Sequence, residues 1–560
     1  MNSAEDVPPP GLSARIASLS QVLRRYASLR VPRYQRGYSW TSEEVSRLLQ
    51  DVRLAVSRDA PYYFVGPIVL VRTAVAGEAD IVDGQQRLAT LTMLLAYLRD
   101  VAEARDQAAL LQKLIAPRKD AGLQLRSQEA EFFRQHVQQQ GGAAKLAALR
   151  NPGSDAEILL AGAAETLAEG LAGFTEAERG ALARFLTERV VFSVMESEDL
   201  EGASLLFRVL NNRGRDLSDA AIIKSELLEA ANLADDEADA AAQHWDRMEE
   251  RIGREQFEQL LDMAPLIISG NTRESPGDLA AFRRDVLEFV DAAQFLQGDL
   301  ARYGAALEAL GRRRFDLPLE AGAEVGRRLI CLGMLKNRFW LPAATAYVAD
   351  HLDDPGEAVR FFAGIERLAF VCTLGVIRPE RRFERFAQVV RARGRANLLF
   401  GPSGVLELTE GERRQTIKRL NEPFQRDHSM RRLVAFRVSA ALGDPLELSS
   451  PFTVEHVLPA RASARAWAAA FPDPADREVL AHLIGNWAIV STGENSEAAD
   501  KPFAEKREIY FRRGDGSVRA MTRDVRAYPD WTPTVVRLRH EKLVAQLCAD
   551  WALVGRAPEK

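Results

Sequence analysis

Residues 79–100 read ADIVDGQQRLATLTMLLAYLRD and decide the fold of the N-terminal part of the chain. The short apolar run 79–82 predicts a strand, and apolar side chains recur at helical spacing after the polar DGQQR turn at 83–87. A strand that leads through a polar loop into a helix gathers free backbone N–H groups and the positive helix end at one spot, which suits a phosphate group. The stretch therefore predicts an α/β unit with an anion site at its turn.

The segments on either side predict more of the same fold. Residues 62–71, YYFVGPIVLV, and residues 189–195, RVVFSVM, are rich in β-branched and aromatic residues and predict two further strands. Residues 41–52, TSEEVSRLLQDV, predict a helix that begins at a Ser/Thr cap. We therefore expect a multidomain α+β protein whose first domain, residues 1–235, is α/β.

Three separate segments of this domain carry polar side chains that suit a nucleotide. They are VPRYQRGYSW at 31–40, the turn at 83–87, and LNNRGRDL at 210–217, which is followed by Lys224 in a predicted helix. Arg36 and Arg87 are suited to clamp phosphate oxygens with paired N–H groups. The chain has no GxxxxGK[ST] loop, which excludes a P-loop mechanism.

The other polar residues of these segments have chemical and structural interpretations. Asp83 suits a divalent cation or a bound water, and Gln85 and Gln86 suit the orientation of that water or contact with a base edge. For any single segment, a structural role is the simpler interpretation, with Asp83 and Ser218 as helix caps and the arginines paired with surface carboxylates.

Together the three segments resemble the ParB-like sensor domain of the GmrSD family of modification-dependent (type IV) restriction endonucleases, which includes SspE-type phosphorothioate-sensing proteins. The family pattern of YQRxYxW, (I/V)DGQQR and LNxRGxxLxxxxxxK is matched over about residues 30–230, with a departure at Gly37. The resemblance implies NTP hydrolysis, with GTP as the expected nucleotide, and recognition of modified DNA. It assigns nucleotide binding to Asp83, Gly84, Gln85, Gln86, Arg87, Asn211, Arg213 and Lys224. It assigns sensing of DNA or its modification to Tyr34, Gln35 and Arg36.

The middle of the chain, residues 236–445, predicts an all-helical domain with a local excess of positive charge. Between residues 378 and 437 there are 15 Arg/Lys and 7 Asp/Glu, a net +8 in a chain whose net charge is −5. A basic stretch of this kind can follow a phosphate backbone, and the alternative is a solvated helical face. The candidates for contact with the DNA backbone are Arg391, Arg393 and Arg395.

The last domain, residues 446–560, predicts two strands and a helix. PFTVEHVLP at 451–459 is a strand ended by proline, and AIVS at 488–491 is a second short strand. Asp500 is placed to cap a following helix, with Pro502 in its first turn. The order of β, loop, β and helix is the ββα outline of a His-Me finger (HNH-type) nuclease.

Hydrolysis of a phosphodiester needs a base that activates water and a cation that stabilises negative charge. His456 is the candidate base, Asn486 would hold its ring or its loop, and Lys506 would meet the scissile phosphate. Mg²⁺ or Mn²⁺ would bind oxygen atoms of Asn495 and Glu455. Adjacent strand residues point to opposite faces, so Glu455 shares a site with His456 only if the strand bends.

These residues resemble the nuclease domain that accompanies the sensor in GmrSD-like proteins. The pattern of EHxxP, GN, N and KPFxxK is matched over about residues 452–545, and Trp531 and Arg537 fit the family's last run. Relatives usually have asparagine at the position of Asp500. The function that we expect is an NTP- and metal-dependent endonuclease acting on modified foreign DNA in anti-phage defence. The alternatives are a nucleotide-switched DNA-binding regulator with a vestigial nuclease and a nuclease toxin that acts on RNA.

Composition sets the outer limits of this interpretation. The chain of 560 residues is too long for one core, and its 47% of hydrophobic residues is ordinary for a soluble protein. Cys331, Cys372 and Cys548 are scattered and predict neither a disulfide framework nor a thiolate zinc site. Without a leader-like start or an 18-residue apolar run, we expect a cytoplasmic protein that binds DNA and a nucleotide but no membrane. The oligomeric state stays open.

Overall fold

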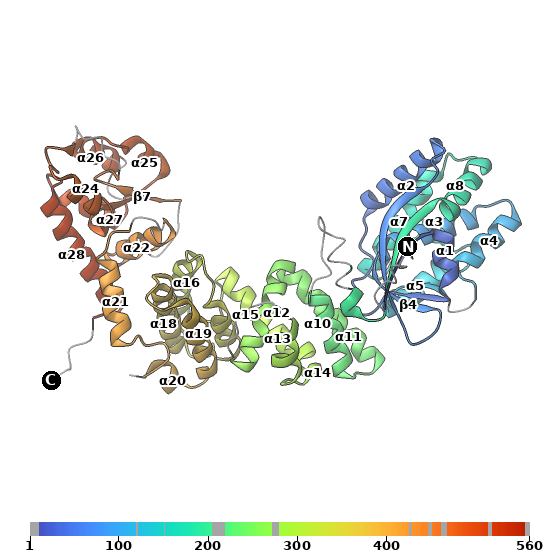
Figure 1. The fold of residues 1–560 in the computed structure, drawn as a ribbon, viewed down its shortest axis with the longest axis horizontal. Helices are drawn as coiled ribbons and strands as arrows, with labels where there is room; N and C mark the ends of the chain where they lie inside the picture. Colours follow the sequence, from blue (N-terminus) through green and yellow to red (C-terminus); the bar gives the residue numbers. More distant parts are fainter. Residues whose placement is uncertain are drawn as a thin grey trace, which may run out of the picture. The chain divides into compact units, whose positions relative to one another are not determined.

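The computed structural model forms two compact units. The first contains Met1–Arg254 with Val290–Gly298, and the second contains Glu255–Phe289 with Asp299–Lys560 (Figure 1). The structure describes residues 11–118, 121–150, 152–203, 206, 219–271, 279–401, 403–424, 428–445, 451–460, 467–512, 514 and 518–554. The mixed α+β architecture agrees with the sequence, whereas the domain boundaries at 235/236 and 445/446 stay predictions.

A six-stranded mixed sheet organises the first unit. Its strands, in spatial order, are β1(Leu12–Ser18), β6(Val190–Ser197), β3(Tyr63–Arg72), β4(Glu78–Asp83), β2(Ser28–Arg30) and β5(Gly122–Gln124). β3 pairs antiparallel with β4 and parallel with β6. The strands predicted at 62–71, 79–82 and 189–195 are therefore confirmed. β2 and β5 were not predicted because three residues carry too little periodicity to be recognised.

The first unit also contains helices, and α3 is the most deeply buried of them. The helices are α1(Leu19–Arg25), α2(Ser42–Ser57), α3(Gln85–Asp100), α4(Arg105–Ile115), α5(Ser127–Phe133), α6(Gly142–Leu146), α7(Asp155–Leu171), α8(Glu176–Glu188), α10(Asp219–Ala231), α11(Asp235–Ile252) and α14(Ala292–Gln294). Leu88, Leu91 and Leu95 of α3 are completely buried. Thr41 caps α2 and forms a capping box with Glu44, as the Ser/Thr cap predicted.

The described residues between 254 and 445 of the second unit form helices joined by turns, without a strand among them, as predicted. The helices are α12(Arg254–Ser269), α13(Leu279–Phe282), α15(Leu300–Arg312), α16(Leu319–Gly333), α17(Leu341–Asp350), α18(Pro355–Thr373), α19(Pro379–Ala392), α20(Ala396–Phe400), α21(Glu410–Leu420) and α22(His428–Ala441). Arg437 on α22 is buried and pairs with Glu366 of α18, 3.2 Å from Nε to Oε1. This buried ion pair ties α22 to the helices that precede it.

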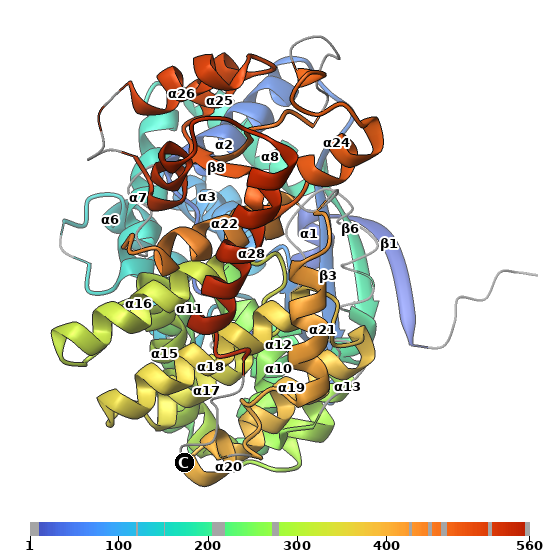
Figure 2. The same ribbon diagram turned by 90° about the vertical axis from the view of Figure 1, so that its left-hand side faces the viewer.

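The C-terminal part of the second unit is built around two antiparallel strands, β7(Thr453–His456) and β8(Trp487–Val490), in which His456 lies opposite Trp487. Both strands were predicted. The helices are α24(Pro474–Ala481), α25(Thr492–Ala498), α26(Phe503–Phe511), α27(Ala520–Arg523) and α28(Pro533–Asp550), and α28 runs beside α22 (Figures 1 and 2).

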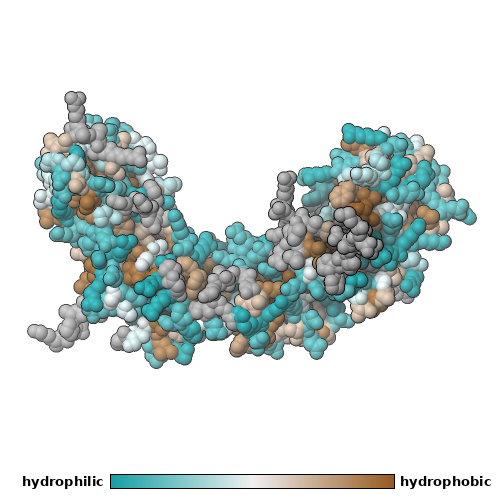
Figure 3. All heavy atoms as spheres, viewed as in Figure 1, coloured by the Kyte–Doolittle hydropathy of each residue, from teal (hydrophilic) through white to brown (hydrophobic). Residues whose placement is uncertain are grey.

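Three details of this region differ from the prediction. A helix, α24, lies between the strands, and Asn495 is inside helix α25 because Ser491 and Glu494 form a capping box just before it. The next helix begins at Phe503, so Pro502 is its N-cap residue and not part of its first turn. Hydrophilic residues cover most of the visible surface (Figure 3). Within the described ranges, no helix is both long and apolar enough to cross a membrane.

Candidate functional sites

The DGQQR turn is fixed by a glycine that no other residue can replace without strain. Gly84 joins β4 to α3 with a φ of +92°, in the left-handed region that favours glycine. A Cβ at this position would lie 2.4 Å from Cγ2 of Ile68 on β3. The turn is therefore pressed against the neighbouring strand, which fixes where α3 begins.

Asp83 and Arg87 form an ion pair beside the turn. Nη2 of Arg87 donates to Oδ2 of Asp83 at 3.0 Å, and Nη1 donates to the backbone oxygen of Val65 at 3.3 Å. Burial raises the pKa of Asp83, although Arg87 and Arg36 counteract this shift. Gly66 has a φ of +119°, and a Cβ there would lie 2.4 Å from Nη1 of Arg87. The guanidinium of Arg87 thus packs directly against the backbone at Gly66, where a side chain would collide with it.

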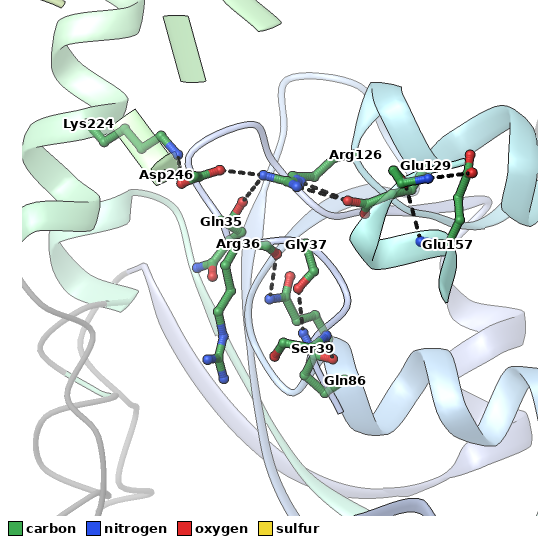
Figure 4. A network of polar contacts seen from close by, with 12 residues as sticks. Gln35, Arg36, Gly37, Ser39, Gln86, Arg126, Glu129, Glu157, Lys224 and Asp246 are labelled. Atoms are coloured by element: carbon green, nitrogen blue, oxygen red, sulfur yellow. Dashed lines mark hydrogen bonds and ion pairs between the residues drawn. The ribbon is translucent and has the colours of Figure 1, made fainter. Parts of the chain in front are cut away.

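The glutamines of the two motifs hold the motifs to each other (Figure 4). Nε2 of Gln85 donates to the oxygen of Arg36 at 3.0 Å, and Nε2 of Gln86 donates to the oxygen of Gly37 at 3.0 Å. Oε1 of Gln86 accepts from the amide of Ser39, and Gln35 donates to the oxygen of Val82, both at 2.9 Å. Gln86 is buried and both ends of its amide are used, so it positions the 31–40 segment. This geometry does not favour the predicted role of orienting water.

Two residues of this region keep features that suit a ligand. Oε1 of Gln85 is buried and has no hydrogen-bond partner among the described residues. Arg36 is exposed, and Figure 4 shows its side chain pointing away from the polar network. Tyr34 is half-buried, and burial raises the pKa of its hydroxyl far above the usual range. Asn211 and Arg213 lie outside the described residues.

Lys224 is part of a buried network of charged side chains. Its Nζ lies 2.6 Å from Oδ1 of Asp246, whose Oδ2 lies 2.7 Å from Nη1 of Arg126. Arg126 also donates to the oxygen of Gln35 at 3.4 Å (Figure 4). Lys224 is 1% exposed, and burial lowers its pKa. The predicted role in nucleotide binding does not fit this geometry, because the ammonium group is enclosed and paired.

Sequence reasoning missed Arg126 and Asp246 because neither lies in a motif. Their signal is indirect, since a lysine in an apolar helix needs a buried acid as its partner. The network also explains the departure at Gly37. A Cβ there would lie 2.4 Å from Oε1 of Glu129 and 2.6 Å from Nη2 of Arg126. A residue larger than glycine would displace this ion pair.

His456 ends strand β7 with its ring half-buried, next to two basic side chains. Its Nε2 lies 3.2 Å from Nη1 of Arg431 on α22. The ring of His482 stands nearly perpendicular to it, with the two centroids 5.6 Å apart. Burial, with Arg431 as the second cause, lowers the pKa of His482. Arg431 therefore places a positive charge beside the imidazole of His456, whereas the lowered pKa of His482 favours its neutral form.

Asn486 fixes the loop that follows His456. Its Oδ1 accepts from the amide of Leu458 at 2.8 Å and from Nε1 of Trp531 at 3.0 Å. Its Nδ2 donates to the oxygens of Leu458 and Ala481, at 2.8 and 2.9 Å. The side chain is completely buried, so Asn486 holds the loop and not the ring.

Glu455 and Lys506 form a buried ion pair on the other side of β7. Nζ of Lys506 lies 2.6 Å from Oε1 of Glu455 and donates to the oxygen of His456 at 3.0 Å. The hydroxyl of Tyr510 donates to the same Oε1 at 3.0 Å. Burial raises the pKa of Glu455 and lowers that of Lys506, and each partner counteracts the shift of the other.

This geometry does not fit the expected roles of Glu455 as a metal ligand and Lys506 as a phosphate contact. Both are enclosed, and adjacent strand residues point to opposite faces. Asn495 is half-buried and lies 3.5 Å from Oγ1 of Thr453 through its amide nitrogen. In the part of the chain that the structure describes, no three His, Cys, Asp or Glu residues gather as they would around a metal ion. These residues by themselves do not make a divalent-cation site.

The three arginines proposed as DNA contacts are engaged within the protein. Nη1 of Arg391 donates to the oxygen of Gly270 at 2.5 Å, and Nη1 of Arg393 donates to the oxygen of Ile267 at 2.5 Å. The guanidinium of Arg395 bonds the oxygen of Arg391. These contacts secure the end of α19 against α12, which does not favour the predicted role in DNA binding.

Comparison with known families gives two matches in the order that the motifs predicted. Residues 19–228 match the family described as GmrSD restriction endonuclease, N-terminal domain. Residues 412–546 match the family described as GmrSD restriction endonucleases, C-terminal domain. Together the matches cover more than half of the chain, and they define a DNA endonuclease of a restriction system. The chain belongs to the GmrSD restriction endonuclease family. No curated protein matches it.

Proposed function

We propose that this chain is an NTP-dependent, metal-dependent endonuclease that cuts or nicks modified foreign DNA in the cytoplasm. In this proposal the first unit binds the nucleotide, with GTP as the expected one, and inspects the DNA. The C-terminal part of the second unit hydrolyses the phosphodiester. The observation that carries the proposal is the place of His456: half-buried, at the end of β7, beside Arg431, within the stretch that matches the C-terminal family domain.

The chemistry assigned to His456 follows from its setting. An imidazole titrates near neutral pH and can take a proton from water in the transition state. Asn486 holds the loop after it with four hydrogen bonds, so the ring is presented from a rigid backbone. The positive charge of Arg431 beside the ring favours a phosphate as its substrate.

A nucleotide in the first unit is supported by the turn at Gly84. A buried acceptor without a donor is costly, so Oε1 of Gln85 favours a ligand or a water that donates to it. The exposed Arg36 supplies a cation suited to phosphate oxygens. Asp83 and Arg87 complete a polar set at the start of α3.

Mg²⁺ or Mn²⁺ remains part of the proposal because phosphodiester hydrolysis benefits from a hard cation. Such a cation often takes some of its ligands from substrate phosphates and water. The carbonyl oxygen of Asn495 is the one group of the predicted pair that keeps this role. We derive no chemical step through the metal.

The test compares matched plasmids that are unmodified, cytosine-methylated, glucosylated or phosphorothioated. Each is incubated with the wild type and with His456→Ala, with and without each NTP and with Mg²⁺, Mn²⁺ or chelator. We expect NTP- and metal-dependent cutting of at least one modified plasmid by the wild type alone. Binding without cutting would support the regulator with a vestigial nuclease, and digestion of tRNA in place of plasmid would support the toxin. Equal cutting by His456→Ala would refute the assignment of the base.

A further inference from the structure

Arg431 contacts the imidazole of His456 although it belongs to none of the recognised motifs. It comes from α22, one turn into the helix, and is 6% exposed. Its Nη1 lies 3.2 Å from Nε2 of His456. In the sequence it is one of 15 basic residues between 378 and 437, so no pattern distinguishes it. Its position suggests that it acts on the imidazole directly.

The chemistry of the two groups determines what this contact does. A guanidinium donates hydrogen bonds but cannot accept them, and it stays charged in proteins. Nε2 of His456 is therefore the acceptor, which places the proton of the neutral ring on Nδ1. In this state Nε2 accepts a hydrogen bond from Arg431, and Nδ1 carries the proton. The resting imidazole has no lone pair to offer to a water molecule.

Lys506 and His482 are two further titratable residues near His456 in the described part of the chain. Lys506 of α26 contacts the backbone oxygen of His456 and is neutralised by Glu455 on the opposite side of the strand. His482 presents its ring edge-on, and Glu478 of α24 acts on His482. Within the described ranges, the guanidinium of Arg431 is a charged group in contact with Nε2, so a phosphate that reaches the base would meet it.

We propose that Arg431 is a further catalytic residue, which covers Nε2 of His456 at rest and transfers to the scissile phosphate when DNA binds. This inference rests on the proposed nuclease function. A guanidinium bonds phosphate oxygens with two parallel charge-assisted hydrogen bonds, which are stronger than one N–H···N contact. Binding of DNA thus draws the guanidinium of Arg431 away from Nε2 of His456, which can then act as the base.

The step that follows is balanced. The freed Nε2 takes a proton from water as the water oxygen forms a bond to phosphorus. The bond from phosphorus to the leaving sugar oxygen breaks, and that oxygen takes a proton from solvent. Arg431 meanwhile stabilises the charge on the phosphate oxygens. Without bound phosphate the base stays covered, which limits hydrolysis of DNA that is not properly seated.

The kinetic test uses two substitutions and one matched control in the full-length protein. Arg431→Met keeps the volume but removes donor and charge, and we expect single-turnover cleavage to fall about 10- to 100-fold, the usual value of a charge-assisted hydrogen bond. Arg431→Lys keeps a charge and should recover part of the rate. The control is Arg432→Met, since Arg432 is exposed and lies over the ring of Phe452, 4.9 Å from its centroid.

The decisive readout is the ¹⁵N resonance of Nε2 in protein labelled at histidine, assigned with His456→Ala. We expect Nε2 to report an accepted hydrogen bond at rest, and to lose it in Arg431→Met or when an uncleavable DNA duplex is added. An Nε2 signal unchanged between wild type and Arg431→Met would overturn the inference. So would a rate loss with no effect of DNA on Nε2, which would make Arg431 a positioning residue. If Arg431→Met does not fold, Arg431→Lys with DNA gives the same decision. Cutting by His456→Ala, in contrast, would refute the nuclease assignment itself.

Discussion

The two motif regions solve the same problem of fixing a polar loop, but with different interactions. Around the DGQQR turn, neutral amides of Gln85 and Gln86 bond the backbone of the 31–40 segment. Strand β7 is fixed by the buried ion pair of Glu455 and Lys506, in which Lys506 also bonds the backbone oxygen of His456. In both regions, most of the recognised motif residues hold the backbone in place. They leave one or two side chains, such as Arg36 and His456, to face a ligand. A motif therefore marks a site without telling which of its residues contact the substrate.

The largest effect that would sharpen this comparison is expected at His456. Loss of a general base typically lowers the rate roughly 10²–10⁴-fold, so His456→Ala should lose DNA cleavage to this extent. NTP turnover should stay unchanged, because the turn at Gly84 lies in the other compact unit. Cleavage rates and NTP turnover measured on the same preparation check this. Cleavage near the wild-type rate would contradict it.

The buried ion pair gives the next largest effect. Lys506→Met should destabilise the second unit by roughly 3–5 kcal/mol, because it leaves the Glu455 carboxylate buried without a counter-charge. The double variant Lys506→Met, Glu455→Gln should recover much of this loss. Denaturant unfolding of the two variants measures it. Equal stability of both would show that the pair is not buried in solution.

Acid should weaken the second unit through His540 on α28. Burial lowers the pKa of this histidine to about 4, and both ring nitrogens lack a partner among the described residues. An unfolded histidine binds a proton below pH 6.5 or so, whereas the folded one does not until about 4. As the pH is lowered from about 6.5 to about 4, the free energy of unfolding should therefore decrease by on the order of 3 kcal/mol. His540→Gln should flatten that fall in denaturant unfolding at several pH values, and an unchanged slope would contradict this.

A smaller effect is expected at Gly66, where the glycine leaves room for Arg87. Gly66→Ala should cost about 1–3 kcal/mol, because it adds a collision with the guanidinium to the strain of a positive φ. Gly77→Ala is the control, since its φ is +82° and the nearest atom to a new Cβ lies 3.8 Å away. Thermal unfolding and NTP turnover should both separate the two variants. Identical behaviour would show that Arg87 is free to move aside.

The smallest effect concerns the basic stretch. Replacing Arg391, Arg393 and Arg395 by glutamine should leave the salt dependence of DNA binding almost unchanged, because these side chains bond backbone oxygens of the protein. A contact with phosphate would instead contribute about 0.9 to the log–log slope. Binding measured between low and moderate salt distinguishes the two, provided that circular dichroism shows a folded triple variant.

The elements that the sequence predicts correctly are those with strong local patterns. Periodicity and turn residues predict β3, β4, α3, β7 and β8. The roles of individual side chains were harder to predict, because they depend on contacts between distant segments. Arg126 lies 91 residues from Gln35 and still bonds its backbone oxygen. Arg431 and His456 are likewise 25 residues apart and meet only through the packing of α22.

We propose that one chain carries two separate chemical centres, and a single paired measurement can separate them. NTP turnover and nicking of one modified plasmid are followed in the same reaction for wild type, Arg36→Ala and His456→Ala. We expect His456→Ala to lose nicking and to keep NTP turnover. Arg36→Ala should lose turnover and change the rate of nicking, because a nucleotide acts on the nuclease only by binding its states differently. Loss of both activities in both variants, or no change in Arg36→Ala, would contradict the account.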